Sequence, residues 1–254
     1  MQDAELLRYS RQIMLPEVDI AGQERMLASH VIIVGLGGLG APAAMYLAAA
    51  GVGRLTLIDD DRVEASNLQR QIIHRSDAVG ASKVASAATT LRDLNPGCEV
   101  TTIDARIDEQ ALAGLLTEAD LVLDATDNFE TRHAINRACR ASRVPLVSGA
   151  AIRWEGQIAV FDFRVEDGPC YACLYAPDTQ GENLNCAENG VAAPIVGVVG
   201  AMQALEALKL LTGVGETLHG ALLVWDGKYQ SWQRLRLQRD PGCALCAAAT
   251  RPTA

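Results

Sequence analysis

A glycine-rich turn over residues 35–40 constrains the fold of this chain more than any other feature of its sequence. The turn, Gly-Leu-Gly-Gly-Leu-Gly, fits the pattern G-x-G-x-x-G, and an aliphatic run from His30 to Val34 precedes it. An Ala-rich segment from Leu39 to Ala50, typical of a helix, follows it. In a strand–turn–helix unit of this kind, a phosphate approaches the second glycine and the N–H groups of the helix N-terminus. The glycines predicted to contribute to such a site are Gly35, Gly37, Gly38 and Gly40.

Aliphatic runs and helix-forming segments alternate along the first 150 residues. Predicted strands cover 30–34, 54–58, 98–104, 120–125 and 144–149, and predicted helices cover 3–14, 21–29, 39–50, 82–93, 108–116 and 128–142. Strands that alternate with helices form parallel sheets, because each helix carries the chain back across one face of the sheet. The pattern therefore predicts an α/β fold with a Rossmann-like, doubly wound, mostly parallel sheet.

The pattern changes after residue 150. Further strands are predicted at 152–154, 157–163, 221–225 and 231–237, with a buried apolar helix over 189–212. We expect these strands to extend the parallel sheet in antiparallel fashion. No linker rich in Pro, Gly or Ser divides the chain. We therefore expect a single domain over 1–254, with a nucleotide-binding half, 1–150, and a second half, 151–254.

The net charge of −9 argues against one large class of function. Proteins that bind nucleic acid are usually basic, so no nucleic-acid partner is expected. The longest apolar stretch, Gly190 to Leu205, is shorter than the roughly 20 residues that span a bilayer. Neither a membrane span nor a secretory signal is expected. The seven cysteines then indicate a reducing, cytoplasmic location, where Cys-x-x-Cys binds metal or carries out redox chemistry.

Polar residues that follow the predicted strands supply a second set of candidates. Asp59 ends a strand at about the spacing (roughly 20 residues) at which an acidic side chain bonds ribose hydroxyls. Asn67 and Arg70 are one helical turn apart, and Lys83 begins a predicted helix. Asp127 lies beyond a strand end, where ligands bind in such sheets. These residues suit a polyphosphate and Mg²⁺, although on spacing alone each fits a solvated loop equally well.

Two Cys-x-x-Cys pairs predict a metal site in the second half. The pairs are Cys170/Cys173 and Cys243/Cys246, and each follows a Gly-Pro or Pro-Gly turn. Four thiolates suit a tetrahedral Zn²⁺ ion, whereas a thioredoxin-like redox pair is the alternative. Cys186 is unpaired and precedes the apolar helix. It is therefore either a nucleophile activated by the helix N-terminus or an idle thiol.

Taken together, these segments resemble the MoeB/ThiF family, bacterial relatives of the ubiquitin-activating enzymes. The matching segments are 8–12 (Arg-Tyr-Ser-Arg-Gln), 35–40, 59–61, 66–71 (Ser-Asn-Leu-Gln-Arg-Gln), Lys83, 124–128 (Asp-Ala-Thr-Asp-Asn), both Cys pairs and 190–194. They extend over essentially the whole chain. Residues 148–153 and 241–243 are more similar to MoeB members, and 225–228 to ThiF members. The resemblance is therefore closest to the MoeB branch.

The resemblance implies an activity. The family uses ATP and Mg²⁺ to adenylate the C-terminal glycine of a ubiquitin-fold sulfur carrier, MoaD or ThiS, which then becomes a thiocarboxylate for molybdopterin or thiamin synthesis. The resemblance implies that Asp59 holds the ribose and that Asp127 holds Mg²⁺. It also implies that the phosphates are held by Asn67, Arg70 and Lys83.

The resemblance further implies partners for the chain. In the family's homodimer, Arg11 would reach the nucleotide of the other subunit, and residues 151–254 would bind the carrier and zinc. Cys186 matches a cysteine that acts covalently in some members and is dispensable in others. The rhodanese domain of some relatives does not follow the second Cys pair, so a separate sulfur donor is expected.

Two other classes of function remain open at this point. An NAD-dependent oxidoreductase would use the glycine turn but has no obvious need for Arg70, Lys83 and Asp127. A non-catalytic binding scaffold would need none of the residue types of an ATP site. Carrier-dependent exchange between ATP and pyrophosphate separates these classes from a carrier adenylyltransferase.

Overall fold

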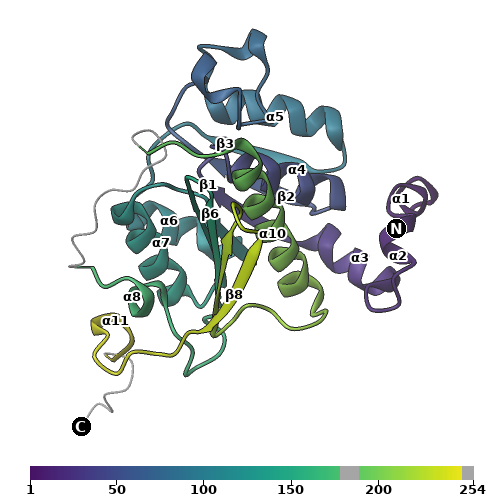
Figure 1. The fold of residues 1–254 in the computed structure, drawn as a ribbon. Coiled ribbons are helices and arrows are strands. Elements are labelled where there is room, and N and C mark those ends of the chain that lie inside the picture. Colours follow the sequence, from purple (N-terminus) through teal and green to yellow (C-terminus); the bar gives the residue numbers. More distant parts are fainter. Residues whose placement is uncertain (178–188, 248–254) are drawn as a thin grey trace.

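The computed structural model describes residues 1–177 and 189–247 of the chain (Figure 1). Its centre is an eight-stranded sheet in the order β3-β2-β1-β4-β5-β6-β7-β8. The strands are β1 (His30–Val34), β2 (Arg54–Ile58), β3 (Glu99–Ile103), β4 (Leu121–Asp124), β5 (Leu146–Ile152), β6 (Glu155–Phe161), β7 (Ala221–Asp226) and β8 (Ser231–Arg236). Neighbours from β3 to β5 pair in parallel. Neighbours from β5 to β8 pair antiparallel, which confirms the predicted extension of a mostly parallel sheet.

Helices cover both faces of the sheet, because its central strands are apolar on both sides. In β1, Val31 and Ile33 belong to one core, while Ile32 and Val34 belong to the other. The first core lies under α4 (Gly40–Ala50), α5 (Lys83–Leu94) and α10 (Ala193–Thr212). The second lies under α6 (Glu109–Leu115), α7 (Phe129–Ser142) and α8 (Tyr171–Leu174). The remaining elements are α1 (Asp3–Arg8), α2 (Ser10–Ile13), α3 (Asp19–Ala28), α11 (Ala244–Ala247) and the short 3₁₀ turns 65–67, 76–78 and 116–118.

Two predicted elements differ from the structure in more than the positions of their ends. The helix predicted over 3–14 is divided at Tyr9, whose buried hydroxyl accepts a hydrogen bond of 2.9 Å from Asn95 Nδ2. The separate strand predicted over 152–154 is wrong. β5 continues to Ile152 and returns through a tight turn directly into β6, with Arg153 at φ +53°. In both places a tertiary contact or an unusual backbone angle overrides the local pattern.

The apolar helix α10 is a core helix of this fold. Among the described residues it is the one helix long and apolar enough to cross a membrane by length and composition. It packs against α4, β5 and β6. Its fully buried Gln203 donates from Nε2 to the carbonyl oxygens of Asp124 (2.8 Å) and Val147 (3.3 Å). The apolar composition of α10 is therefore accounted for by its packing in the protein core.

Candidate active site and metal centre

A cleft of about 620 Å³ lies at the carboxyl ends of β1, β2, β4 and β5. The chain runs outward from β1 to β2 and β3, then returns to β4 on the other side of β1. Such a reversal of strand order leaves a crevice between the loops, which is where ligands bind in open α/β sheets. The sequence-predicted residues that line this cleft are Gly35, Gly37, Gly38, Asp59, Asn67, Arg70, Lys83 and Asp127.

The three glycines of the G-x-G-x-x-G pattern have different surroundings. Gly35 adopts φ +93°, and a Cβ there would lie 2.7 Å from the carbonyl oxygen of Ala125. A Cβ at Gly40 would lie 1.9 Å from the carbonyl oxygen of Gly35. A Cβ at Gly37 would come no closer than 3.7 Å to a side-chain atom of Gln71. Gly35 and Gly40 therefore close the turn, whereas Gly37 leaves its backbone open to a ligand. Gly40 does not line the cleft.

The peptide groups of Leu36 fix the glycine turn from both sides. The Leu36 N–H donates to Asp59 Oδ2 at 2.6 Å, and the Leu36 carbonyl oxygen lies 3.2 Å from His74 Nε2. Because a carbonyl oxygen only accepts, Nε2 carries the proton and Nδ1 accepts from the Ser86 hydroxyl at 3.0 Å. Burial lowers the pKa of His74, which favours this neutral ring.

Asp59 is held in place by hydrogen bonds to both of its carboxylate oxygens. Burial raises its pKa above the ordinary value and outweighs the opposing effects of Lys83 and of the N–H groups of Leu36 and Asp61. Its second oxygen, Oδ1, accepts from the Asp61 N–H at 2.9 Å. A half-buried carboxylate with fixed oxygens at a strand end suits hydrogen bonds from ribose hydroxyls, as expected from its position in the sequence.

Lys83 reaches the cleft as one member of an ion pair. Its Nζ lies 2.7 Å from Asp61 Oδ2, with the lysine side chain 7% exposed and the aspartate side chain 66% exposed. Asp61 therefore remains largely exposed to solvent while it pairs with Lys83. The two residues are 22 positions apart, and only the approach of β2 to the start of α5 brings them together.

Asn67 and Arg70 lie on one turn, as their spacing predicts. Asn67 is buried and its Oδ1 accepts from the Glu64 N–H at 3.1 Å, which ties the short 3₁₀ turn to the chain before it. The Arg70 guanidinium donates to the Ser66 carbonyl oxygen at 3.1 Å. Both side chains line the cleft on the same side as Lys83 and Asp61. This side of the cleft therefore combines two cationic groups with an amide.

Asp127 lies on the opposite side of the glycine turn, in the loop between β4 and α7. It is exposed and lines the cleft. The next residue, Asn128, caps α7 by accepting from the Thr131 N–H at 2.9 Å. A free carboxylate oxygen beside a phosphate site is the type of ligand that Mg²⁺ takes in nucleotide-binding proteins. The donor chemistry of Asp127 thus fits the predicted magnesium ligand.

The four paired cysteines form one compact cluster. The Cys170 sulfur atom lies 3.8 Å from the sulfur atoms of both Cys173 and Cys243. Cys173 Sγ lies 3.5 Å from Cys246 Sγ. Four thiolates at a Zn–S distance of about 2.3 Å form a tetrahedron with edges of about 3.8 Å. All four ligand atoms lie within 4.8 Å of one another, and three of the residues are buried. The cluster therefore has the size and chemistry of a Cys₄ zinc site.

Comparison with known proteins decides between the remaining classes. A model of the ThiF family matches residues 9–245. The chain belongs to the ThiF family. It is 50% identical over 248 residues to the molybdopterin-synthase adenylyltransferase of Escherichia coli K12, covering 97% of this chain and 98% of that one. It is 46% identical over 249 residues to the sulfur carrier protein ThiS adenylyltransferase of the same organism, covering 98% of each.

These matches show that the chain is an adenylyltransferase of the ThiF family. The NAD-dependent oxidoreductase and the non-catalytic scaffold are set aside on this ground. Solved structures share the fold: E. coli MccB with ATP superposes with a TM-score of 0.81 at 24% identity, over 94% of this chain and 73% of that one. PaaA superposes with a TM-score of 0.81 at 24% identity, over 94% of this chain and 76% of that one.

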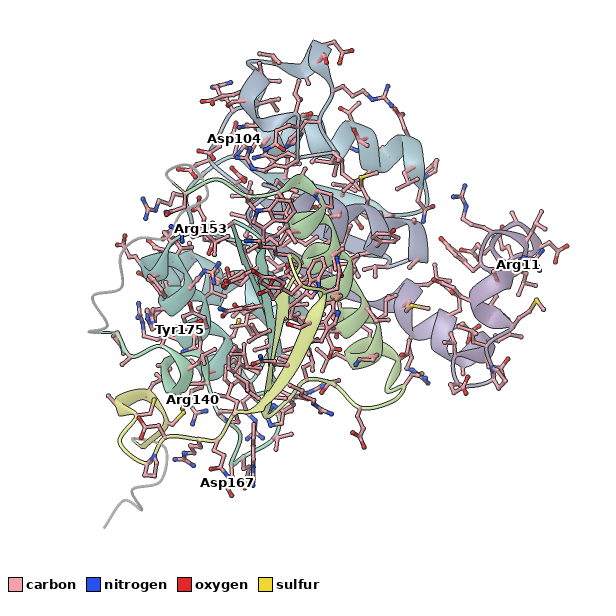
Figure 2. All side chains as sticks on the ribbon, in the orientation of Figure 1. Arg11, Asp104, Arg140, Arg153, Asp167 and Tyr175 are labelled. Atoms are coloured by element: carbon pink, nitrogen blue, oxygen red, sulfur yellow. The ribbon has the colours of Figure 1, made fainter. Side chains whose placement is uncertain are left out.

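Two residues implied by the ThiF-family resemblance lie away from the cleft or outside the described part of the chain. Arg11 is an exposed residue of α2 whose closest polar contact is Met14 Sδ, 3.9 Å from its Nη1. Figure 2 shows Arg11 at the opposite edge of the molecule from Tyr175, which lines the cleft. Arg11 therefore does not reach the cleft of its own chain. Cys186 lies outside the described residues.

One wall of the cleft was not predicted from the sequence. It consists of Phe129, Arg132, Gln157, Tyr171 and Tyr175. The Tyr171 ring packs against that of Tyr175 with centroids 5.3 Å apart, and the Tyr175 hydroxyl donates to Gln157 Oε1 at 2.6 Å. Tyr171 lies between Cys170 and Cys173, and Tyr175 follows the pair by two residues, so the metal cluster and the cleft share the α8 segment. The only local sequence signal is their position in and after the Cys-x-x-Cys motif.

Proposed function

We propose that this chain uses ATP and Mg²⁺ to adenylate the C-terminal glycine of a small, ubiquitin-fold sulfur carrier of the MoaD type. Adenylation would activate the carrier for thiocarboxylate formation in molybdopterin synthesis. The observation that carries the proposal is the cleft at the β1/β4 switch point, where Asp59, Arg70, Lys83 and Asp127 surround an open Gly37. The 50% identity to a molybdopterin-synthase adenylyltransferase supports the choice of pathway.

The reaction needs no general base from the protein. A carboxylate oxygen of the carrier's terminal glycine attacks the α-phosphorus of ATP, the bond to the bridging α–β oxygen breaks, and pyrophosphate leaves. Because the attacking carboxylate is already ionised at neutral pH, the protein mainly positions two anions and stabilises the charge on the leaving group. This agrees with a cleft whose polar residues are mostly cations, amides and carboxylates rather than a histidine.

Each polar residue then has one role. The Gly37 backbone and the N-terminus of α4 would bind a phosphate, while Arg70 and Lys83 would neutralise the β- and γ-phosphates. Asp59 would accept from the ribose hydroxyls. Bound at Asp127, Mg²⁺ would neutralise phosphate charge and orient the nucleotide. Lys83 would exchange Asp61 for phosphate, because Asp61 is exposed and its pairing with Lys83 is weakened by solvent.

The remaining assignments concern partners. A homodimer would allow Arg11, which lies far from its own cleft, to contact the nucleotide of the partner subunit. Zn²⁺ at the four cysteines would hold α8 to α11 and thereby support the aromatic wall of the cleft. Sulfur would reach the acyl-adenylate from a separate donor protein in the cytoplasm. Neither nucleic acid nor a membrane takes part.

The test is carrier-dependent exchange of radiolabelled pyrophosphate into ATP. The purified chain is incubated with MoaD-type and ThiS-type carriers in parallel, each with a matched carrier that lacks its terminal glycine. The proposal expects exchange with the MoaD-type carrier and none with the truncated one. Exchange with only the ThiS-type carrier would assign the protein to thiamin synthesis instead. The 46% identity to a ThiS adenylyltransferase supports this alternative. Exchange that needs no carrier, or none with any carrier, would contradict the proposal.

A further inference from the structure

A buried charge pair lies beneath the loop that carries Asp127. Asp124, the last residue of β4, is 0% exposed, and Arg132 in the first turns of α7 is 8% exposed. Asp124 Oδ2 lies 4.0 Å from Arg132 Nε and accepts from the Ser148 hydroxyl at 2.8 Å. Removing two charges from water is costly, and a well-packed apolar pair often serves stability equally well. The pair therefore calls for an explanation other than stability.

The pair holds one residue of the loop, Thr126, through both its N–H and its carbonyl group. Asp124 Oδ1 accepts from the N–H of Thr126 at 3.1 Å and from its hydroxyl at 2.7 Å. The Arg132 guanidinium donates through Nη2 to the Thr126 carbonyl oxygen and, at 3.1 Å, to the Gly149 carbonyl oxygen in β5. The planar guanidinium thus connects the loop after β4 to the neighbouring strand β5. Asp127 is the next residue after Thr126, and the clamped Thr126 carbonyl belongs to the peptide group that joins the two.

The residue after Asp127 is also held. Asn128 caps α7 through the Thr131 N–H. Asp127 is therefore the exposed middle residue of a segment whose two neighbours are anchored by buried or capping hydrogen bonds. An exposed carboxylate on an otherwise free loop would sample many positions, whereas this backbone admits few. Positional errors of about 1 Å at a reacting centre can cost on the order of 10²-fold in rate.

We propose that Arg132 is a positioning residue for adenylation: by clamping Thr126 between Asp124 and β5, it orients Asp127 toward the nucleotide. The proposal rests on the role of Asp127 in the proposed function. Arg132 acts through Asp127, so its effect on the reaction requires the Asp127 carboxylate. A purely structural role for Arg132 would instead lower stability and leave the dependence on Mg²⁺ unchanged.

The experiment compares Arg132→Lys and Arg132→Met with Arg137→Met. Arg137 lies on the same helix but forms an exposed ion pair with Glu109 at 2.6 Å, so it is a matched control. Lysine keeps the charge but cannot donate to two carbonyl groups in one plane. Arg132→Lys is expected to lower the pyrophosphate-exchange rate on the order of 10- to 100-fold and to raise the half-saturating Mg²⁺ concentration. Arg137→Met is expected to leave both unchanged.

Two readouts separate positioning from stability. Amide hydrogen exchange of residues 126–128, measured without nucleotide, should accelerate in Arg132→Lys and stay unchanged in Arg137→Met. In a double-mutant cycle, Arg132→Lys should have little further effect on exchange activity once Asp127→Ala is present, because coupled residues are not additive. Additive losses, or unchanged Mg²⁺ dependence together with unchanged amide exchange, would overturn the proposal.

A second variant keeps the proposal falsifiable if Arg132→Lys does not fold. Ser148→Ala removes the hydroxyl that donates to Asp124 and adds no bulk. It should accelerate amide exchange at residue 126 and raise the half-saturating Mg²⁺ concentration several-fold; a folded Ser148→Ala that behaves like the wild type in both readouts contradicts the clamp. Failure of the proposed function is recognised separately, because the wild-type chain itself would then show no carrier-dependent exchange, whereas the amide-exchange readout of the clamp needs neither carrier nor nucleotide.

Discussion

The polar residues of the cleft include exposed carboxylates, whereas the four cysteines between α8 and α11 face one another. Asp127 is exposed. Asp61 is also exposed and forms an ion pair with Lys83 that solvent weakens. In the metal cluster, Cys170 and Cys246 are fully buried, and the sulfur atoms already lie at the separations that zinc requires. This difference in exposure distinguishes the site for a substrate, which must leave, from the site for a metal ion, which stays bound. A substrate that must leave meets exposed groups with exchangeable partners, while a resident ion meets sulfur atoms that are gathered within 4.8 Å of one another.

The largest expected effect is that of Asp127→Ala on chemistry. Loss of a magnesium ligand at the reacting phosphate should lower pyrophosphate exchange about 10³-fold, or roughly 4 kcal/mol. Because Asp127 is exposed, the free energy of unfolding should stay within about 0.5 kcal/mol of the wild type. Asp104→Ala, an exposed carboxylate that follows β3 and does not line the cleft, is the control. Near wild-type exchange by folded Asp127→Ala would contradict the assignment.

A substitution in the metal cluster is expected to lower stability rather than catalytic activity. Cys243→Ser should release zinc and lower the free energy of unfolding on the order of 3 kcal/mol, because structural zinc contributes folding free energy directly. The protein that remains folded should retain most of its exchange activity per folded molecule. Metal analysis and chemical denaturation measure the two quantities, with Cys98→Ala as a buried thiol outside the cluster. Substoichiometric zinc with Cys-x-x-Cys disulfides in the wild type would show that the cluster is a redox site.

Arg11 tests whether the cleft is completed by a second subunit. Arg11→Ala should lower exchange about 10²-fold, as expected for an arginine that stabilises phosphoryl charge in trans. Arg8→Ala, on the preceding helix with a hydrogen bond to the Leu94 carbonyl oxygen, should have little effect. Mixing Arg11→Ala with Asp127→Ala should restore part of the activity, since one of the two sites in the heterodimer would be wholly wild type. Verified heterodimers without recovery would show that Arg11 has no such role.

The pH dependence of stability should report on the support of the glycine turn. Burial lowers the pKa of His74, so the unfolded chain takes up a proton at a higher pH than the folded one. The stability that the neutral ring contributes is present above about pH 6.5 and is lost as the pH falls through the folded pKa. His30 and His133 shift in the same direction for the same first cause.

The measurement is chemical denaturation between pH 8 and pH 5. The wild type should lose stability as the pH falls, because the lowered pKa values of His30, His74 and His133 mean that unfolding takes up protons there. His74→Gln should show a shallower loss than the wild type. Asp59 acts with the opposite sign, because burial raises its pKa and its contribution is present at low pH and lost as the pH rises. If the free energy of unfolding falls equally with pH in the wild type and in His74→Gln, His74 does not contribute to the pH dependence.

The smallest effect is expected at Cys186, which lies outside the described residues. Adenylation uses the carboxylate of the carrier, so that step needs no protein thiol. Cys186→Ala should keep exchange within a few-fold of the wild type, or less than about 1 kcal/mol. It should also support thiocarboxylate formation with sulfide or a persulfide donor. A dithiothreitol-sensitive adduct between Cys186 and the carrier, lost together with sulfur transfer in Cys186→Ala, would establish the covalent route instead.

Sequence patterns located the first half of the sheet closely. The strands predicted over 30–34 and 54–58 coincide with β1 and β2, and the helix over 128–142 differs from α7 by one residue at its start. Continuous aliphatic runs are unambiguous when a strand is buried on both faces. The turn between β5 and β6 was missed, because its two residues follow an apolar run and Arg153 adopts a left-handed conformation that no local pattern indicates.

The candidate site divides in the same way. Glycines, cysteines and the polar residues after strands belong to motifs whose spacing reflects local geometry, so they were found before the fold was known. Arg132 and Tyr171 carry no such spacing. A charged residue within a helix is ordinarily solvated, and only the packing of α7 against β4 and β5 buries Arg132 beside Asp124.

The sequence by itself determined which chemical groups the chain offers and the order in which strands, turns and helices present them. These properties depend on interactions between residues a few positions apart. The tertiary structure decided which groups meet: Lys83 with Asp61, 22 positions away, and Cys170 with Cys243, 73 positions away. Such proximity follows from strand order, register and helix packing, which are set by burial summed over the whole chain rather than by any local segment.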